Sequence, residues 1–391
     1  MKRRLIIFAL GLSEPGTMGG NSKIALEMAR CLASSIEVHF VLPHYKLPTF
    51  ASTLGEDSGV KVHALEDFPG SDKYHPFKSV RHYLPKVREL FRELGIGSGD
   101  VVFGMSDFHI DVLPLYPLQR EFGFKWLPSV FLFVPGLFEN LRAGYGFPAF
   151  KYAVYWIYQR WLFRKMRRRA TGFVITNDVD KAQFPAAMQA RLFAYYGGVN
   201  VDQIPAKPAA KTRDVVFCSR LHPQKGIDGF LDVWRLVRVQ CPAVRLTVIG
   251  NGEPAYERLL KAKAARLGLA DSIDWLGYVN NEAKYAIYAS AKVHVHPTVF
   301  DNNGMVAAEA LCSGLPVVMF DLPPLREVYT TGCVKVPVGD QAAFAAAVVR
   351  LLTDDAYHAQ VAPTPAQVAA LRDEWNWPHR AERFAKWLET L

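Results

Sequence analysis

The chain has 391 residues, of which 50% are hydrophobic and 21% charged, and this balance excludes a disordered or collagen-like protein. Its length predicts two or three domains. The net charge of +9 is unevenly placed, because residues 1–200 carry 25 Lys and Arg against 17 Asp and Glu, whereas residues 201–391 carry 21 against 20. The positive charge therefore bears on a function of the first half.

The N-terminal segment imitates a signal peptide, since Lys2, Arg3 and Arg4 precede an apolar run at residues 5–12. The run is short for that purpose, and no small-residue cleavage site follows it. Five scattered cysteines without a C-x-x-C pair favour reduced thiols over disulfides or a zinc site. No apolar stretch approaches the roughly 18 residues of a membrane-spanning helix. We therefore interpret the run as a first strand and expect a cytoplasmic protein.

Short β-rich runs alternate with segments of helical period, which predicts βαβ units and mainly parallel sheets. We predict an α/β protein of two Rossmann-like doubly wound domains, residues 1–203 and 204–375, with a Pro- and Ala-rich connector near residues 197–213. Ligands of such sheets bind beyond the carboxyl ends of the strands, so the cleft between the two domains is the expected active site. The expected strands are residues 5–10, 38–42, 60–64, 101–105, 130–134, 173–176, 215–218, 245–249, 273–276, 293–296, 316–320 and 334–336, and the expected helices of the second half are residues 228–240, 256–267, 282–289, 305–311 and 342–352.

Two cations follow the strand expected at residues 215–218. Arg220 and Lys225 lie five residues apart across a turn, so both side chains can converge at the mouth of the cleft. Such a pair suits a diphosphate, whose charge must be neutralised as it departs. Two solvated loop cations are the alternative.

A second segment, residues 296–316, ends a strand, crosses a polar loop containing Gly304 and opens a helix of small residues. The unpaired N–H groups and the positive dipole end of that helix favour phosphate oxygens. Asp301 and Glu309 are eight residues apart, one in the loop and one about a turn into the helix, so they can touch opposite ends of one ligand. A buried Glu309 with a polar partner is the alternative.

The run from about Val215 to Asp354 resembles the donor domain of the retaining glycosyltransferases of family 4, which have the GT-B fold. Ser219-Arg220-Leu221 and Lys225-Gly226 match the family's G-R-L and K-G. Asp301-x7-Glu309, followed by Ala-Leu-x-x-Gly-x-Pro-Val, matches its Glu-x7-Glu motif and the E-A-L-x-x-G-x-P-V run. Further landmarks lie at residues 198–200, 246–252 and 275–278.

The resemblance implies that Arg220 and Lys225 bind the donor's diphosphate, that Glu309 holds the ribose hydroxyls, and that Asp301 faces hydroxyls of the transferred sugar. No divalent metal or other cofactor is implied, because Arg and Lys supply the charge. The family also suggests that a C-terminal helix at residues 376–391 packs back on the N-terminal domain. The remaining substrate contacts implied are the glycine loop at Gly19 and Gly20 and the N–H groups at Asn303, Gly304, Met305 and Val306.

The sequence departs from the family pattern at two places. Asp301 replaces the usual Glu, so its carboxylate is about one methylene farther from the sugar. The family's histidine after the fifth N-terminal strand corresponds to Phe133-Val134-Pro135-Gly136, which offers no imidazole. From these departures we hypothesise an unusual donor sugar, one without an ordinary 6-hydroxyl.

Polar residues past two strands of the first half are candidate acceptor contacts. Asp107 and His109 follow the strand expected at residues 101–105 and could contact the acceptor or assist proton transfer. A satisfied loop feature is the alternative for this pair. Glu139, Asn140 and Arg142, past the next strand, are weaker candidates.

A basic aromatic segment, residues 152–169, contains six aromatic and six cationic residues and no acidic one. One interpretation is an interfacial helix on an anionic membrane surface, with aromatics at the lipid boundary. The other is a helix that packs its aromatics on the first sheet and leaves its arginines in solvent. Nucleic acid is not expected, because no nucleic-acid-binding motif accompanies the cations.

Taken together, the sequence predicts a retaining, metal-independent transferase. It would move a sugar from a UDP- or GDP-sugar donor to a hydroxyl of a glycan or lipid-linked glycan, in the cytoplasm and at the inner face of the plasma membrane. A nucleotide-sugar epimerase of the same fold and a catalytically silent nucleotide-sugar-binding protein remain as alternatives.

Overall fold

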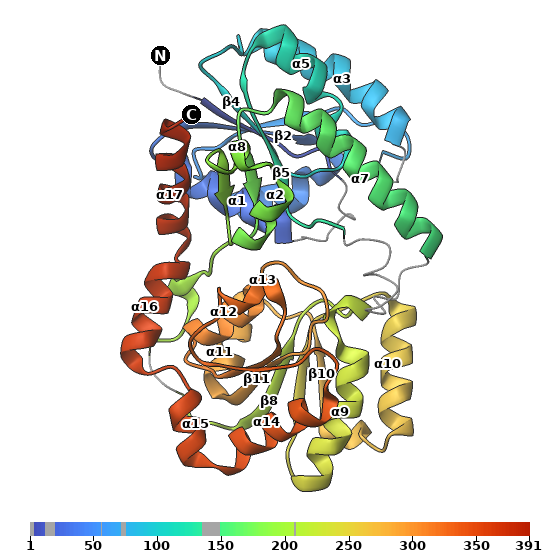
Figure 1. Cartoon of the computed structure of the whole chain (residues 1–391), viewed down its shortest axis with the longest axis vertical. Coiled ribbons are helices and arrows are strands. Elements are labelled where there is room, and N and C mark those ends of the chain that lie inside the picture. The colour runs from blue at the N-terminus through green and yellow to red at the C-terminus, as the bar shows by residue number, and fades with distance from the viewer. Residues whose placement is uncertain (1–3, 12–19, 56, 72–75, 135–148, 207–208) are drawn as a thin grey trace. The chain divides into compact units, whose positions relative to one another are not determined.

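The computed structural model describes residues 4–11, 20–55, 57–71, 76–134, 149–206 and 209–391. These residues form two compact units (Figure 1). The N-terminal unit contains the described residues up to Gly197 together with Trp377–Leu391, and the C-terminal unit contains those of Gly198–Asn376. Each unit is built on a parallel sheet with connecting helices, which confirms the prediction of two Rossmann-like α/β domains.

The N-terminal unit has a seven-stranded sheet in the order β3-β2-β1-β4-β5-β6-β7, which reverses direction between β1 and β4. Most of its strands are buried on both faces, so they read as apolar runs rather than as alternating ones, whereas the edge strand at Lys61–Leu65 is largely exposed. The strands are β1 (Arg4–Phe8), β2 (Glu37–Pro43), β3 (Lys61–Leu65), β4 (Val101–Gly104), β5 (Lys125–Val130), β6 (Phe173–Ile175) and β7 (Leu192–Ala194), and the helices are α1 (Gly20–Leu32), α2 (Leu47–Leu54), α3 (Pro76–Glu93), α4 (His109–Val112), α5 (Leu115–Phe122), α7 (Ala149–Arg169), α8 (Ala186–Gln189) and α17 (Trp377–Glu389).

The fifth strand corrects the sequence prediction, which placed it at residues 130–134. It occupies Lys125–Val130 and pairs in parallel with β4. A charged residue at its start and Pro128 in its middle hide this strand in the sequence, because proline is rare inside central strands. Pro128 lies before Ser129 and Val130, the two residues through which β5 pairs with β6. Strand β7 was not expected at all.

The C-terminal unit has a six-stranded sheet in the order β10-β9-β8-β11-β12-β13, which reverses between β8 and β11. All six strands and the five helices expected there are found within a few residues of their predicted bounds. The strands are β8 (Arg213–Cys218), β9 (Leu246–Ile249), β10 (Ile273–Gly277), β11 (Ala291–His296), β12 (Val317–Phe320) and β13 (Cys333–Val336), and the helices are α9 (Ile227–Gln240), α10 (Pro254–Arg266), α11 (Asn281–Ser290), α12 (Met305–Cys312), α13 (Pro323–Arg326), α14 (Gln341–Thr353), α15 (Asp355–Val361) and α16 (Pro365–Trp375).

Helix α17 belongs to the N-terminal unit, although it ends the chain (Figure 1). It packs against α1, and Phe384 makes edge-on ring contacts with Phe103 and Phe193 at centroid distances of 6.1 and 5.3 Å. The carbonyl oxygen of Leu391 accepts a hydrogen bond from Lys125 Nζ at 2.8 Å. The last helix of the chain therefore completes the core of the first unit.

Within the described ranges, no helix has both the length and the apolar character needed to cross a membrane.

Candidate functional site

The first part of the candidate site is the loop between β8 and α9. Pro223–Lys225 forms a single 3-10 turn, and Gly226 follows it with a φ of 72°. A Cβ at Gly226 would lie 1.9 Å from the carbonyl oxygen of Pro297, so only glycine allows the two loops to come this close. Arg220 is exposed, and Lys225 points into the adjoining loop after β11. The structure thus brings the β8 and β11 loops into contact.

Asp301 is the residue that Lys225 reaches. Lys225 Nζ lies 2.6 Å from Asp301 Oδ2, and Asp301 Oδ1 accepts hydrogen bonds from the N–H groups of Asn302 and Asn303 at 2.8 and 3.2 Å. The N–H of Gly304 is 3.3 Å from the same oxygen. Burial alone would raise the pKa of this carboxyl, but the Lys225 ammonium and the N–H groups outweigh burial and hold the pKa well below its usual range. Asp301 is therefore ionised and sits in an anion-binding arrangement.

Gln224 ties the two loops together, a role that the sequence analysis did not assign. Its side-chain Nε2 donates to the carbonyl of Phe300 at 2.6 Å, and its own carbonyl accepts from Val299 N at 3.2 Å. These bonds fix the residue before Lys225 relative to Val299 and Phe300, which precede Asp301. The position of Gln224 between the two cations was the only signal for it in the sequence.

Helix α12 begins directly after this loop. Gly304 adopts the left-handed conformation, with φ 61° and ψ 33°, and precedes Met305, the first residue of the helix. The Tyr329 hydroxyl lies 2.7 and 2.9 Å from the carbonyls of Asn303 and Gly304 and fixes the approach to the helix. The N–H groups at Met305 and Val306 belong to the first turn, which lacks intrahelical acceptors. The predicted N–H groups and Asp301 are thus brought together.

Glu309 lies one turn into α12 and is buried. Its Oε2 is 2.8 Å from Nζ of Lys284, a residue of α11 that the sequence analysis did not single out. Lys284 Nζ also lies 3.2 Å from Oδ1 of Asn281. This ion pair is the polar partner that the alternative for Glu309 anticipated. Nothing in the sequence pairs a lysine on one helix with a glutamate on another, so only the tertiary structure reveals it.

At the corresponding edge of the N-terminal sheet, Gly20 is exposed and begins α1, whereas Gly19 lies outside the described residues. The end of β1 is held by Asp111, whose Oδ1 accepts from Gly11 N at 2.8 Å. A Cβ at Gly11 would lie 2.7 Å from Asp111 Oδ2. Gly11 is therefore closely packed against Asp111 at this edge, and the role expected of Gly19 stays a prediction.

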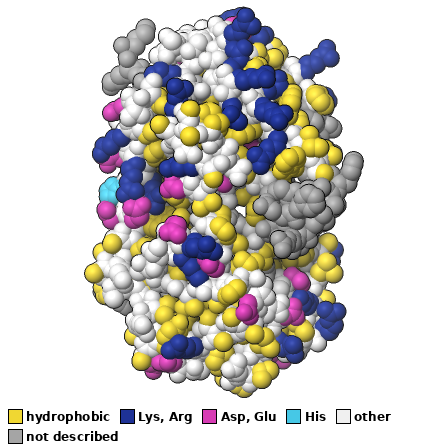
Figure 2. All heavy atoms as spheres, viewed as in Figure 1, with side chains coloured by type: hydrophobic (Ala, Val, Ile, Leu, Met, Phe, Trp, Pro, Cys, Tyr) yellow, Lys and Arg dark blue, Asp and Glu magenta, His cyan; other side chains and the backbone are white. Residues whose placement is uncertain are grey.

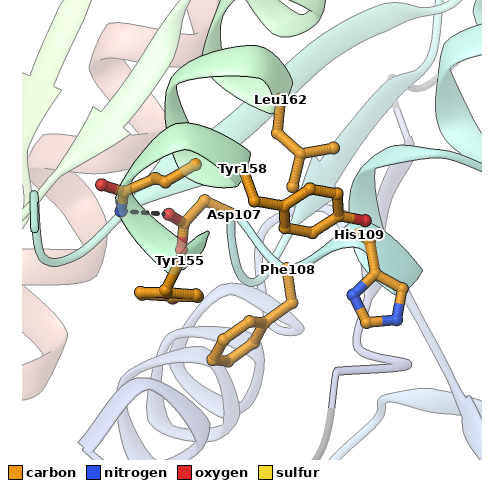
Figure 3. Close-up of a pocket in the computed structure, with 7 residues that line it drawn as sticks. Asp107, Phe108, His109, Tyr155, Tyr158 and Leu162 are labelled. Atoms are coloured by element: carbon orange, nitrogen blue, oxygen red, sulfur yellow. Dashed lines mark hydrogen bonds between the residues drawn. The ribbon is translucent and has the colours of Figure 1, made fainter. Parts of the chain in front are cut away.

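Asp107 and His109 line a cavity of about 150 Å³ together with aromatic side chains of α7 (Figure 3). Gln159 of α7 donates from Nε2 to Asp107 Oδ2 at 2.6 Å and to the carbonyl of Leu132 at 2.8 Å. Its Oε1 accepts from Val134 N at 2.9 Å. Gln159 was missed because a single glutamine in an aromatic helix gives no sequence signal. It connects the ends of β4 and β5 to α7.

Burial governs the charges in this cavity. It raises the pKa of Asp107 to about 6, and the Gln159 hydrogen bond only partly offsets this. Burial also lowers the pKa of His109 to about 4, so the imidazole is neutral at pH 7. The other candidate acceptor residues, Glu139, Asn140 and Arg142, lie outside the described residues, as do Pro135 and Gly136.

Helix α7 buries one side of the basic aromatic segment and exposes another. Leu162, Phe163 and Met166 are buried in the core, whereas Val154, Ile157 and Trp161 are 52%, 63% and 44% exposed. The exposed apolar residues recur at helical spacing on one stripe, which Arg164 and Arg168 continue with exposed cations. Figure 2 shows cationic and apolar side chains interspersed over the N-terminal unit.

No three His, Cys, Asp or Glu side chains of the described part of the chain come together as a set that could hold a metal ion.

Comparisons with known proteins bear on the C-terminal unit first. Residues 212–354 match the model of the family described as glycosyl transferases group 1. The chain is 30% identical over 224 residues to the phosphatidyl-myo-inositol mannosyltransferase of Mycobacterium leprae, which covers 55% of this chain and 58% of that protein. It is 26% identical over 162 residues to O-antigen chain mannosyltransferase B of Escherichia coli, covering 41% and 42% of the two chains. The chain thus aligns with little more than half the length of the first of these relatives.

Solved structures match the whole chain in fold. The sucrose-phosphate synthase of Thermosynechococcus elongatus has a TM-score of 0.75 at 17% identity, covering 100% of this chain and 99% of that one. The HepE protein of Anabaena in complex with UDP-glucose has a TM-score of 0.74 at 16% identity, covering 99% and 100%. At this level of identity the likeness shows that the two units have the GT-B architecture.

Proposed function

Because residues 212–354 match the model of the glycosyl transferases group 1 family, we propose that the chain transfers a sugar from a nucleotide-sugar donor, a UDP- or GDP-sugar, to a hydroxyl acceptor. The observation that carries this proposal is the cluster of Arg220, Lys225, Asp301 and the start of α12 at the carboxyl ends of β8 and β11. Those ends flank the point where the strand order reverses, where doubly wound sheets bind their ligands.

In this proposal Arg220 and Lys225 neutralise the diphosphate as it leaves. Arg220 is exposed and makes no ion pair among the described residues, whereas Lys225 is held by Asp301 before the donor arrives. The N–H groups at the start of α12 add a positive dipole end for phosphate oxygens. Preorganised donors of this kind contribute about 3 kcal/mol each to transition-state stabilisation. No divalent metal is required, because these groups supply the positive charge.

The reaction proposed is a front-face substitution with retention. The bond between the anomeric carbon and the diphosphate oxygen breaks, and the acceptor oxygen bonds to the same face of that carbon. The acceptor's proton passes to the departing phosphate oxygen, so no protein base is obligatory. Asp301 faces the transferred sugar, and Glu309, positioned by Lys284, holds the ribose hydroxyls.

A thermal-shift panel of UDP- and GDP-sugars identifies the donor. Saturation at about 100 times the dissociation constant stabilises the protein by roughly 2.7 kcal/mol. With that donor and candidate acceptors, Arg220→Ala should lower transfer by at least 100-fold while the unfolding temperature stays unchanged. The matched control is Arg258→Ala, an exposed arginine of α10. Transfer at near-normal rates by Arg220→Ala would overturn the proposal, and an epimerised sugar formed without acceptor would identify an epimerase instead.

We further propose that the acceptor is a glycan or lipid-linked glycan presented at an anionic membrane surface on the cytoplasmic side, and that α7 contacts this surface. The support is the exposed stripe in which Val154, Ile157 and Trp161 are followed by Arg164 and Arg168. In such a contact the apolar side chains enter the lipid boundary and the arginines meet anionic head groups. Each arginine near the surface contributes about 1 kcal/mol to the free energy of binding.

Vesicle co-sedimentation tests this surface. The protein should bind vesicles of phosphatidylcholine with phosphatidylglycerol and release them at high salt. The pair Arg164→Gln and Arg168→Gln should weaken binding by about tenfold or more, and neutralising Arg167–Arg169 should weaken it further. The control pair is Arg258→Gln and Lys261→Gln, two exposed cations of α10. Equal binding by all variants would exclude α7 as the contact.

A further inference from the structure

We propose that the cavity between the end of β4 and α7 binds a pyranose ring of the acceptor (Figure 3). The role of that ring as acceptor rests on the proposed transferase function, whereas the binding of a sugar ring rests on the cavity itself. The lining side chains are Asp107, Phe108, His109, Tyr155, Tyr158, Gln159 and Leu162.

The size of the cavity fits a single six-membered ring. Its volume is about 150 Å³. An apolar cavity of roughly this volume in another protein core takes up a benzene ring. A disaccharide therefore extends beyond the cavity, and one ring is the part that the cavity selects.

The aromatic lining supplies flat apolar faces. Tyr158 stacks on Trp161 with a centroid distance of 5.7 Å and an interplanar angle of 20°, which holds its ring in place. Phe108 and Tyr155 lie 6.5 Å apart, with their rings tilted by 44°. The face of an aromatic ring is electron-rich, so it attracts the C–H groups on one side of a pyranose. This lining suits a ring that is apolar on its faces and polar around its edge.

Asp107 supplies the polar group that such an edge needs. Its carboxylate accepts a side-chain hydrogen bond from Gln159 and a backbone one from its own N–H, out of the roughly four that an ionised carboxylate can accept. The hydrogen bonds of the Gln159 amide to Leu132 and Val134 keep Asp107 in its present orientation. Among the described residues, no cation pairs with Asp107. Its free acceptor capacity is therefore available to hydroxyl donors.

The charges select a neutral ligand. A phosphate or carboxylate in the cavity would be repelled by Asp107, and an alkyl chain would leave the carboxylate buried without additional donors. A cationic amine would be repelled by the cations of α7, of which Arg160 and Arg164 are nearest in the sequence to the lining residues. Sugar hydroxyls satisfy the carboxylate without bringing a charge of either sign.

Ligand-observed NMR with simple glycosides tests the proposal directly. The probes are methyl α-glucopyranoside, methyl α-galactopyranoside and methyl α-mannopyranoside, each titrated without donor. At least one should bind wild-type protein, and Asp107→Asn should weaken that binding by about 5- to 10-fold, because a charge-assisted hydrogen bond becomes a neutral one. Tyr158→Leu, which keeps an apolar side chain but removes the flat face, should weaken it by at least 5-fold.

The matched control is Phe77→Leu, an aromatic side chain of α3 that is 82% exposed. This variant should bind the glycoside as wild type does. The proposal is overturned if no glycoside binds, if Asp107→Asn and Tyr158→Leu bind as tightly as wild type, or if glucosamine binds in place of the neutral sugars.

Kinetics separate this proposal from the proposed function. If the chain is a transferase, Asp107→Asn should raise the acceptor KM by about 5- to 10-fold and leave the thermal shift with donor unchanged. Unchanged acceptor KM with normal transfer would overturn the cavity assignment and leave the transferase intact. Glycoside binding in the cavity without any transfer would overturn the transferase proposal and leave the cavity assignment intact.

Discussion

Asp301 and Asp107 occupy corresponding places in the two units, and their surroundings are opposite. Each follows the strand that neighbours the first strand of its sheet, β11 beside β8 and β4 beside β1, where the strand order reverses. Asp301 receives the Lys225 ammonium and backbone N–H groups, whereas Asp107 receives one amide and faces aromatic rings. The pKa of Asp301 is therefore held below its usual range, and that of Asp107 is raised to about 6.

The two proposals assign a different kind of ligand to each of these corresponding positions. The C-terminal unit gathers cations and N–H groups at its switch point, which suits a charged diphosphate. In the N-terminal unit, Arg164, Arg167 and Arg168 of α7 are exposed, whereas the cavity at the switch point is lined with rings and a carboxylate, which suits the uncharged sugar proposed for it. No Lys or Arg of the described residues lines this cavity, so the excess positive charge of residues 1–200 lies elsewhere in the first half of the chain.

The largest expected effect concerns the buried pair in the C-terminal unit. Lys284→Met leaves the Glu309 carboxylate buried without its cation, and removal of one partner of a buried ion pair costs about 3 to 5 kcal/mol. Glu309→Gln should cost a similar amount. The double variant should be clearly more stable than the sum of the two losses predicts, as measured by urea unfolding. Strict additivity would show that the two side chains do not interact.

A smaller loss of stability is expected from a substitution where the β8 and β11 loops of the C-terminal unit meet. Gly226→Ala places a Cβ against the Pro297 carbonyl and forces an L-residue into a positive φ, so it should cost about 2 kcal/mol or more. Gly229→Ala is the matched control, because it lies within α9 and its Cβ would meet its nearest atom at 4.0 Å. The free energy of unfolding of that control should rise by about 0.5 to 1 kcal/mol, because alanine is favoured over glycine inside a helix. Unfolding temperatures that rank the two variants in the opposite order would contradict this packing.

The smallest effect tests the contrast between the two carboxylates through pH. Because the folded-state pKa of Asp107 is raised, its ionisation costs stability above pH 6, and the cost vanishes as the pH falls through about 4. Asp107→Asn should therefore be more stable than wild type by about 2 kcal/mol at pH 8 and equal to it below pH 4.

Asp301→Asn should behave oppositely, because a lowered pKa contributes stability above about pH 4 that is lost as the pH falls further. The variant should be less stable than wild type at pH 7, and the difference should shrink in acid. Thermal unfolding from pH 3 to pH 8 measures both profiles. If both variants differed from wild type in the same direction, the opposite pKa shifts inferred for Asp107 and Asp301 would be wrong.

The C-terminal unit was predictable because its local patterns are strong. Its strands are short apolar runs between turn residues, and its helices carry regular period, so their bounds are close to those expected. The loops that hold Arg220, Lys225 and Asp301 follow strands directly, and parallel topology brings the ends of neighbouring strands to one edge.

The sequence by itself therefore determined the fold class, the order of the elements and the edge of the second sheet where charged groups collect. Tertiary structure alone decided which groups meet: Lys225 with Asp301, Lys284 with Glu309, and Gln159 with Asp107. It also decided that β5 runs through Pro128 and that α7 turns one stripe into the core and another into solvent. The physical reason is that strand and helix patterns are local, whereas the charge state of a buried carboxylate depends on neighbours brought to it by distant parts of the chain.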